Sequence, residues 1–442
     1  MFGTVVALVA AAAFGGCATT APASKPAGEA KRLPKGLDSA NNGDPFASTY
    51  RALPSRPTAL FGATVFTGTG ERIDGGTVLI RDGKIEAIGA GLVPPASYDV
   101  VDAAGKYITP GLIDAHSHLG IDEEASGPAG DDVNERMDPV TPHVRAIDAV
   151  NPADLGFADA LHGGVLTINV LTGSGNPIGG LGAVLRTAGT VVDDMIIRSP
   201  SGLKSALGEN PKRVHGGKGR LPSSRLGTAA LIREWLTRAA ERLGNGGDHE
   251  RDLKLEALAL VLNREIPWRQ HCHRADDVAT AIRLADEFGY RLVIDHGTEA
   301  LVVADRLAER GVPVLTGPLL NARMKVELRS KSIANPARLT AAGVKVALIT
   351  DHPVVPVQML QVQAALAVRE GMDPAEALRA VTSTPAEVLG VAGSLGTLTP
   401  GKAATMCAWT GDPLDVRSRV RWAWIDGVRV VDDGPHPDRL SP

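Results

Sequence analysis

Two histidines spaced two residues apart, His116 and His118, end a short apolar run that follows a Pro-Gly break. On a β-strand, residues i and i+2 point to the same face, so both imidazoles would aim at one point. Neutral imidazole is a common ligand of zinc and similar divalent metals, so that point could hold a metal ion. Alone the pair is a weak signal, because a merely polar strand end would look the same.

Three later segments also carry histidines directly after short apolar runs, and they strengthen the interpretation as a metal site. These segments are Gln270-His271-Cys272-His273, Ile294-Asp295-His296-Gly297 and Thr350-Asp351-His352-Pro353. Imidazole and carboxylate together suit zinc or a similar borderline divalent metal. Such an ion would lower the pKa of a bound water toward about 7 and so supply hydroxide at neutral pH.

From residue 112 to residue 389 the sequence alternates apolar strands with amphipathic helices, which is typical of parallel βαβ units. The second half predicts strands at 312–315 and 344–350, and helices at 275–288, 299–310, 336–342, 357–369 and 374–389. This regular spacing favours strands five to eight of a barrel. Active sites of such barrels lie at the carboxyl ends of the strands, where His271, His296 and Asp351 fall.

The first half of this region is less regular. It predicts a strand at 165–170, a fourth strand at 195–198 that leads into 202–211, and helices at 228–243 and 250–264. The glycine-rich stretch 171–182 lacks the Gly-Lys-Ser/Thr ending of a phosphate-binding loop. We therefore interpret it as a tight loop that borders the active-site face.

Short β-strands occupy both ends of the chain. They are predicted at 63–67, 76–80, 84–88 and 99–102, and again at 406–409, 420–424 and 425–431. Asp-Gly pairs separate neighbouring strands at both ends, as they do in tight hairpins. This shared style suggests that the two ends join in one small β-domain, with two unrelated hairpins as the alternative.

The four histidine-bearing segments, with Thr350-Asp351 and the stretch 398–404 (LTPGKAA), resemble the amidohydrolase superfamily. The resemblance is closest to its imidazolonepropionase-like and prolidase-like members and spans about residues 60–431. It implies an α/β fold: a (β/α)8 TIM barrel at 111–395 with a small β-sandwich domain formed by 58–110 and 396–442.

The resemblance also implies a site with Zn2+ or a similar divalent metal, as one or two ions. The implied metal ligands are His116, His118, His271, His296 and Asp351, with Lys204 or Glu209 as alternatives for a bridging ligand between two ions. Asp351 would act as general base and then acid, and His296 would help to stabilise the oxyanion. Whether His271 or His273 is the ligand is left open.

Substrate contacts are expected from the histidines that do not bind metal and from basic residues after the 312–315 strand. The candidates are His273 and His352, and Arg323, Lys325 and Arg329 for a substrate carboxylate. His352 alternates away from Asp351 on an extended segment, so a supporting role is its alternative. For the three basic residues, an exposed loop position is the alternative.

The leading function is therefore hydrolysis of a C–N bond in a cyclic amide or a dipeptide-like substrate. A metal-dependent deaminase would use nearly the same site. A lipid-anchored binding protein on an inactive barrel is the third reading. Such a protein would be expected to lose Asp351 or the histidine pair, and this chain keeps both.

Composition limits the partners. The net charge is −4 and aromatic residues make up 4% of the 442 residues, which argues against nucleic acid. The three cysteines, Cys17, Cys272 and Cys407, are too few and too scattered for a disulfide framework. The partner we expect is a small-molecule substrate, and a homo-oligomer is compatible with the sequence.

The N-terminus suggests a bacterial lipoprotein. A short apolar run at 5–14 is followed by Gly15-Gly16-Cys17, which resembles a processing site where Cys17 is lipidated. The first residues carry no Lys or Arg, unlike an ordinary signal segment. With 1–17 as signal segment and 18–57 as a disordered tether, we expect a periplasmic protein that contacts the membrane only through a lipid anchor. A cytoplasmic protein is the alternative.

Overall fold

The computed structural model describes residues 1, 3, 48–52, 54–244 and 250–432. The predicted lipidation site, Cys17, and most of the predicted tether lie outside these residues. Within the described ranges, none of the helices combines the length and apolar character that crossing a bilayer requires.

The last part of the predicted tether is bound to the fold. Ser48 Oγ donates to the carbonyl of Ile196 at 2.8 Å, and the Tyr50 hydroxyl hydrogen-bonds to Asp426. The Arg186 guanidinium lies 3.3 Å from the centre of the Tyr50 ring, and its Nε donates to Asp426 at 2.9 Å. Ser48 and Tyr50, within the segment predicted as a tether, are therefore held by hydrogen bonds and a cation–π contact.

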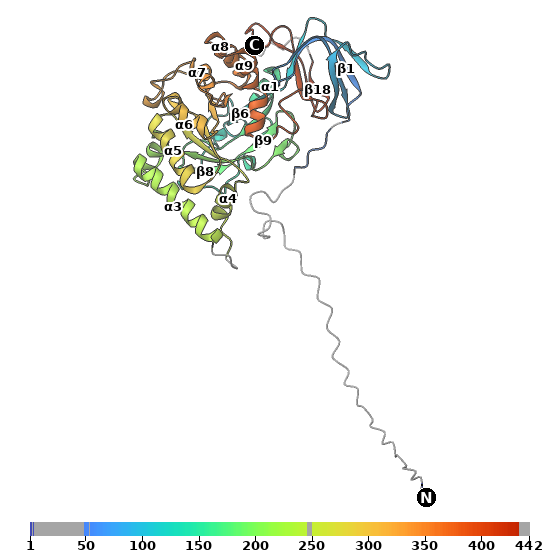
Figure 1. The fold of residues 1–442 in the computed structure, drawn as a ribbon. Coiled ribbons are helices and arrows are strands. Elements are labelled where there is room, and N and C mark those ends of the chain that lie inside the picture. The colour runs from blue at the N-terminus through green and yellow to red at the C-terminus, as the bar shows by residue number, and fades with distance from the viewer. Residues whose placement is uncertain (2, 4–47, 53, 245–249, 433–442) are drawn as a thin grey trace.

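Strands from both ends of the chain form one eight-stranded sheet, in the order β18-β17-β16-β5-β1-β2-β3, with β4 paired to β1. Figure 1 shows the first and the last strands together in this domain. Because β5 bridges β1 and β16, the strands form one continuous hydrogen-bonded sheet rather than the two sheets expected of a sandwich. Its members are β1 (Thr58–Phe66), β2 (Arg72–Arg81), β3 (Lys84–Ala90), β4 (Asp99–Asp102), β5 (Tyr107–Pro110), β16 (Met406–Trp409), β17 (Val420–Ile425) and β18 (Val428–Val431).

The two Asp-Gly pairs make the expected turns. Asp82 and Gly83 have φ of 51° and 73° between β2 and β3, and Asp426 and Gly427 have φ of 48° and 77° between β17 and β18. Positive φ at both central residues is what a two-residue hairpin turn requires, and Asp-Gly adopts it at low cost.

The rest of the fold is mixed α/β, with two further sheets. One has the order β10-β9-β7-β6, with β6 and β7 parallel; the other has the order β15-β14-β13-β12-β11-β8, with β11 to β15 parallel. The strands are β6 (Leu112–Ser117), β7 (Val165–Val170), β8 (Ile178–Leu181), β9 (Ala183–Arg186), β10 (Ile196–Arg198), β11 (Leu203–Ala206), β12 (Trp268–Cys272), β13 (Leu292–His296), β14 (Val314–Thr316) and β15 (Val346–Leu348).

The two sheets adjoin where β15 meets β6, since the amide of Asp351, after β15, donates to the carbonyl of His116 in β6 at 3.2 Å. A single residue, Gly182, connects β8 of one sheet to β9 of the other. The fourth parallel strand differs from the prediction. The segment predicted for it, β10, runs antiparallel to β9, and the strand beside β12 is β11.

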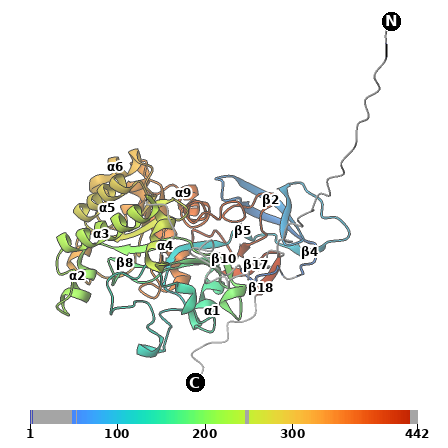
Figure 2. The ribbon, with the colours of Figure 1, turned by 90° about the horizontal axis from the view of Figure 1, so that it is seen from below.

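Helices cover the outer side of these parallel strands (Figure 2). They are α1 (Leu155–His162), α2 (Glu209–Gly216), α3 (Arg225–Gly244), α4 (Leu253–Leu262), α5 (Ala275–Phe288), α6 (Ala304–Glu309), α7 (Asn335–Ala341), α8 (Leu360–Arg369), α9 (Pro374–Arg379) and α10 (Ser383–Val388). Short 3-10 helices are η3 (Gly127–Gly130), η4 (Ala146–Asp148), η5 (Val192–Asp194), η6 (Ala300–Val303), η7 (Val326–Leu328) and η8 (Val357–Met359). Residues of α3 to α7 and β11 to β15 form one apolar core, so the strand ends rest on a packed base.

Candidate active site

His116, His118 and Asp351 converge at neighbouring strand ends. His116 lies on β6 and His118 follows it, while Asp351 lies three residues after β15. Asp351 Oδ1 lies 3.2 Å from His116 Nε2 and 3.3 Å from His118 Nε2, and one donor atom from each residue lies within 4.8 Å of the others. Two imidazoles and a carboxylate at this spacing are a donor set that a divalent metal can use.

Backbone carbonyls fix the tautomer of two histidines. His118 Nδ1 lies 2.7 Å from the carbonyl of Leu171, and His296 Nδ1 lies 2.9 Å from that of Gly317. A carbonyl oxygen only accepts, so each Nδ1 carries the hydrogen and each Nε2 keeps a lone pair. The Nε2 atoms of His118 and His296 are therefore available to bind a metal ion. It also leaves His296 Nε2 without a hydrogen to donate to an oxyanion, so the tautomer favours the ligand role over the oxyanion role expected for His296.

A buried charge cluster lies behind His116. Asp295 Oδ2 lies 3.3 Å from His116 Nδ1, and the same carboxylate forms an ion pair with Arg269 at 2.7 Å and with Lys204 at 3.5 Å. Burial opposes ionisation of Asp295, but Arg269, His116 and Lys204 outweigh it and hold the pKa of Asp295 well below its usual range. A carboxylate behind a ligating imidazole orients the ring and raises its basicity.

Lys204 lies against the histidines, as expected for one of the two bridging candidates. Its Nζ lies 3.1 Å from His116 Nε2, and its side chain is 1% exposed. Burial lowers the pKa of Lys204, so the neutral amine is more accessible than for a surface lysine. Glu209, the other candidate, opens α2 and lines the cavity, where its backbone amide donates to Glu327 at 2.8 Å.

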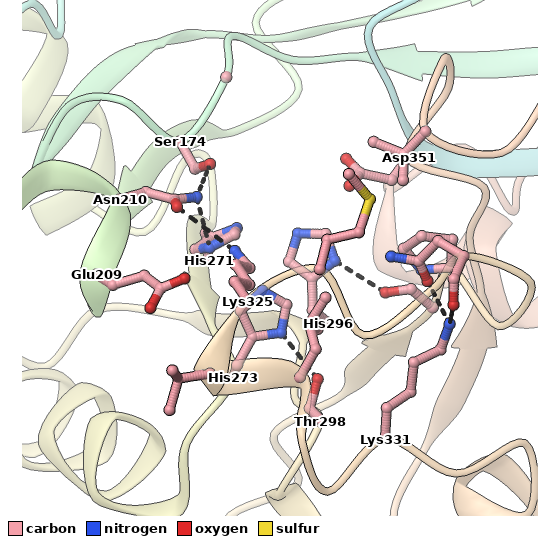
Figure 3. Close-up of a pocket in the computed structure, with 18 of the residues that line it drawn as sticks. Ser174, Glu209, Asn210, His271, His273, His296, Thr298, Lys325, Lys331 and Asp351 are labelled. Carbon is pink, nitrogen blue, oxygen red and sulfur yellow. Dashed lines mark hydrogen bonds between the residues drawn. The ribbon is translucent and has the colours of Figure 1, made fainter. Parts of the chain in front are cut away.

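His271 and His273 both adjoin His296, so the choice between them as ligand stays open. Their ring centres lie 4.6 Å and 5.0 Å from that of His296. Burial lowers the pKa of both rings well below the usual value, which favours the neutral form that binds metal. His273 Nδ1 lies 2.8 Å from the Thr298 hydroxyl, and His271 Nε2 lies 3.4 Å from the Asn210 amide nitrogen (Figure 3).

Two of the gathered residues have an unusual backbone. His296 has φ of 72° and Asp351 has φ of 54°. Residues other than glycine adopt this left-handed region rarely, at a cost of order 1–3 kcal/mol. The surrounding contacts therefore outweigh this strain and point both side chains where the strands end.

Asp114, earlier in β6, connects the strand ends that carry His116 and Asp351. It is fully buried, accepts hydrogen bonds from the Thr350 hydroxyl and from the His116 amide, and burial raises its pKa to about 7. This link holds β6 to the segment that carries Asp351. Asp114, Asp295 and Arg269 were not among the predicted site residues. For Asp114 and Asp295, a carboxylate inside an apolar strand was the signal that could have identified them.

A cavity of about 990 Å³ opens at these strand ends and includes His118, His271, His273, His296 and Asp351 in its lining. Its wall also holds polar residues that the sequence analysis did not select: Asn134, Ser174, Asn210, Asn321, Lys331 and Asn335. The cavity is large enough for a small organic substrate.

Three predicted substrate contacts do not line this cavity. The Arg323 and Arg329 residues are exposed, and Arg323 donates to the carbonyl of Lys331 at 2.9 Å. His352 is fully buried; its Nδ1 accepts from the Val357 amide at 3.2 Å. Of the three basic residues considered after β14, Lys325 is the one that lines the cavity.

Comparison with known proteins identifies the family. The amidohydrolase family model matches residues 246–430. The crystal structure of an amidohydrolase from Thermotoga maritima MSB8 is 43% identical, covers 85% of this chain and 100% of that chain, and superposes with a TM-score of 0.82.

Two curated relatives extend the comparison. Amidohydrolase tasK from Hapsidospora irregularis is 30% identical over 395 residues, which are 81% of this chain; the chain spans 40% of that protein's length. The imidazolonepropionase of Maricaulis maris (strain MCS10) is 27% identical over 360 residues, covering 75% of this chain and 86% of that protein. The chain belongs to the amidohydrolase family and is a hydrolase that acts on carbon–nitrogen bonds.

Proposed function

We propose that this chain is a metal-dependent amidohydrolase that opens a cyclic amide or cleaves a dipeptide-like substrate, with Asp351 as general base and then acid. The observation that carries the proposal is the convergence of His116, His118 and Asp351 on one side of a large cavity. The imidazolonepropionase relative supports a cyclic amide as one substrate class.

We also propose that the parallel strands close into a (β/α)8 TIM barrel. The hydrogen bond between Asp351 and β6, and the one-residue connection from β8 to β9, support closure. Closure would explain why β6 and β15, which are far apart in sequence, present their side chains to one cavity.

His116, His118, His296 and Asp351, with His271 or His273, are the residues that would hold zinc or a similar divalent ion. If two ions bind, our choice for the bridging ligand is Lys204 carbamylated at Nζ by CO2, because a carbamate would supply two oxygen donors and this amine lies beside His116. When bound, the metal supplies Lewis-acid activation of a water nucleophile.

The protein's own groups then handle the proton. Burial opposes ionisation of Asp351, but His296, His116 and His118 hold its pKa well below the usual range, so the carboxylate is ready to accept. Asp351 takes a proton from the attacking water at a carboxylate oxygen and returns it to the leaving nitrogen.

A substrate screen tests the proposal. Purified protein with added zinc is offered dipeptides, cyclic ureides and lactams, and the products are identified by mass spectrometry. We expect ring opening or peptide cleavage that His118→Ala abolishes. Release of ammonia from an exocyclic amine would favour a deaminase, and turnover that survives removal of metal would overturn the proposal.

A further inference from the structure

Lys325 presents a positive charge to the cavity without a carboxylate partner. Its side chain is partly buried, and its Nζ lies 3.5 Å from the Asn210 amide oxygen. Among the residues that the structure describes, no carboxylate forms an ion pair with this ammonium within 4.0 Å. Burial lowers the pKa of Lys325, while Glu327 and Glu209 oppose that change from farther away. A partly desolvated cation in this position gains from an anion that a ligand brings.

The other cations near this wall are placed differently. Lys331 also lines the cavity, but its ammonium donates to both the carbonyl and the side-chain oxygen of Asn321. Arg323 and Arg329 are exposed and do not line the cavity. Lys212 and Arg213 of α2 do line it, which adds positive charge on the side of Lys325.

The groups around Lys325 are fixed. The Asn210 side-chain amide donates to Ser174 Oγ at 2.8 Å, which orients its oxygen toward Lys325. Figure 3 shows Lys325 beside His271 and His273, with Asp351 on the other side of His296. The ammonium and the proposed base therefore lie at opposite sides of the histidine group.

Glu327 fastens the segment that carries Lys325 to α2. Its carboxylate is 2% exposed, accepts from the Glu209 amide at 2.8 Å and pairs with Arg225, which also bonds to Asp277 at 3.0 Å. A Cβ on Gly208, which has φ of 89°, would approach this carboxylate to 2.7 Å. The hydrogen bond and the ion pair of Glu327 therefore join η7 to the start of α2 and to α3, two residues from Lys325.

We infer that Lys325 is a specificity-determining residue that pairs with a carboxylate of the substrate. The inference rests on the proposed function and names its substrate class: an amide that carries a carboxylate on the side of His271 and His273, away from Asp351. The charge pair forms in a partly desolvated cavity, where a charge-assisted hydrogen bond is stronger than one at the surface.

The test compares substrates that differ only in this charge. Zinc-loaded full-length protein is offered glycyl-L-leucine and its C-terminal amide, and 5-carboxymethylhydantoin and hydantoin. For a pair that is turned over, we expect Lys325→Met to lower kcat/KM for the carboxylate form about 10- to 100-fold, through KM, and to change the neutral form far less. Lys325→Arg should restore part of the preference, because it keeps the charge.

Arg329→Gln is the matched control, since it removes the same charge from the same loop outside the cavity. It should leave both members of each pair unchanged. An equal loss for both members in Lys325→Met would mean that Lys325 only packs, and a wild-type enzyme that does not prefer the carboxylate form would overturn the inference.

Binding separates failure of this inference from failure of the proposed function. Calorimetric titration with N-acetyl-L-leucine and N-acetyl-L-leucinamide reports recognition without turnover. We expect the carboxylate to bind about 10-fold or more tightly than the amide, and Lys325→Met to remove that difference. If the carboxylate binds in this way but nothing is hydrolysed, the proposed function is wrong and the inference stands. If substrates are hydrolysed but Lys325→Met does not change carboxylate binding, the inference is wrong and the proposed function stands.

Discussion

Lys204 Nζ lies 3.1 Å from His116 Nε2, although both side chains are buried among apolar strands. Asp351 Oδ1 also lies 3.2 Å from the same Nε2. Three electron-pair donors, an amine, an imidazole and a carboxylate, therefore lie close together in a buried place. Burying them costs free energy unless they share a cation or a proton.

The first prediction concerns Lys204. If it bridges two ions, as we propose, Lys204→Glu should keep more bound metal than Lys204→Met, because only glutamate supplies an oxygen donor. We expect Lys204→Met to bind no more than one ion per chain and to lose most turnover. Metal analysis by mass spectrometry measures this. Equal metal content in the two variants would remove Lys204 from the ligand set.

The second prediction concerns the metal itself. His118→Ala removes an imidazole whose Nδ1 is fixed by the Leu171 carbonyl, so metal affinity should fall about 10- to 100-fold or more, and turnover with it. Chelation of the wild type should abolish activity, and added zinc should restore it. His162→Ala on the surface of α1 is the control and should behave as wild type. Full activity after exhaustive chelation contradicts the prediction.

The third prediction separates binding from proton transfer. Asp351→Asn keeps an oxygen near both histidines but cannot accept the proton from water. We expect it to retain part of the metal while kcat falls about 10²- to 10⁴-fold. Metal content and steady-state kinetics are measured on the same preparation. If the variant loses its metal while its folded structure is unchanged, the main role of the carboxylate would be that of a metal ligand.

The fourth prediction concerns Glu327. Glu327→Gln removes the charge of a buried carboxylate, which is one of the two carboxylate partners of Arg225. The free energy of unfolding should fall by about 1–3 kcal/mol, and KM for a carboxylate substrate should rise because the loop of Lys325 loosens. Denaturant unfolding and kinetics measure the two effects. Glu241→Gln on the exposed face of α3 is the control, and unchanged values for Glu327→Gln would contradict the role.

The sequence alone was sufficient to predict those features that depend on one short stretch of residues. The Asp82-Gly83 turn follows from residue type alone, and the shared direction of His116 and His118 follows from strand geometry. The rest depends on contacts between distant segments. Nothing near Lys204 in the sequence shows that its strand is β11, because the antiparallel strands β8 to β10 precede it.

The basic residues after β14 also could not be told apart from the sequence alone. Arg323, Lys325 and Arg329 share one loop and one charge, yet only Lys325 faces the cavity. The difference comes from Glu327, which ties this loop to α2 over 118 residues of sequence. The contact between Glu327 and the distant helix α2 thus helps to determine which cation faces the cavity, and the spacing of residues within the loop carries no information about it.

The pairing of β5 with both β1 and β16 has a practical consequence for dividing this protein. β5 ends at Pro110, and a single residue, Gly111, separates it from β6, so the strand that carries His116 continues directly from the shared sheet. A fragment cut after residue 395 would leave β5 with an open edge and would expose apolar residues of β1 and β2 that pack against β16 and β17. We expect such a fragment to aggregate, whereas adding residues 396–432 as a separate chain should recover the soluble enzyme. The catalytic half and its sheet are therefore one unit for engineering, and new linkers or fusions belong outside residues 48–432.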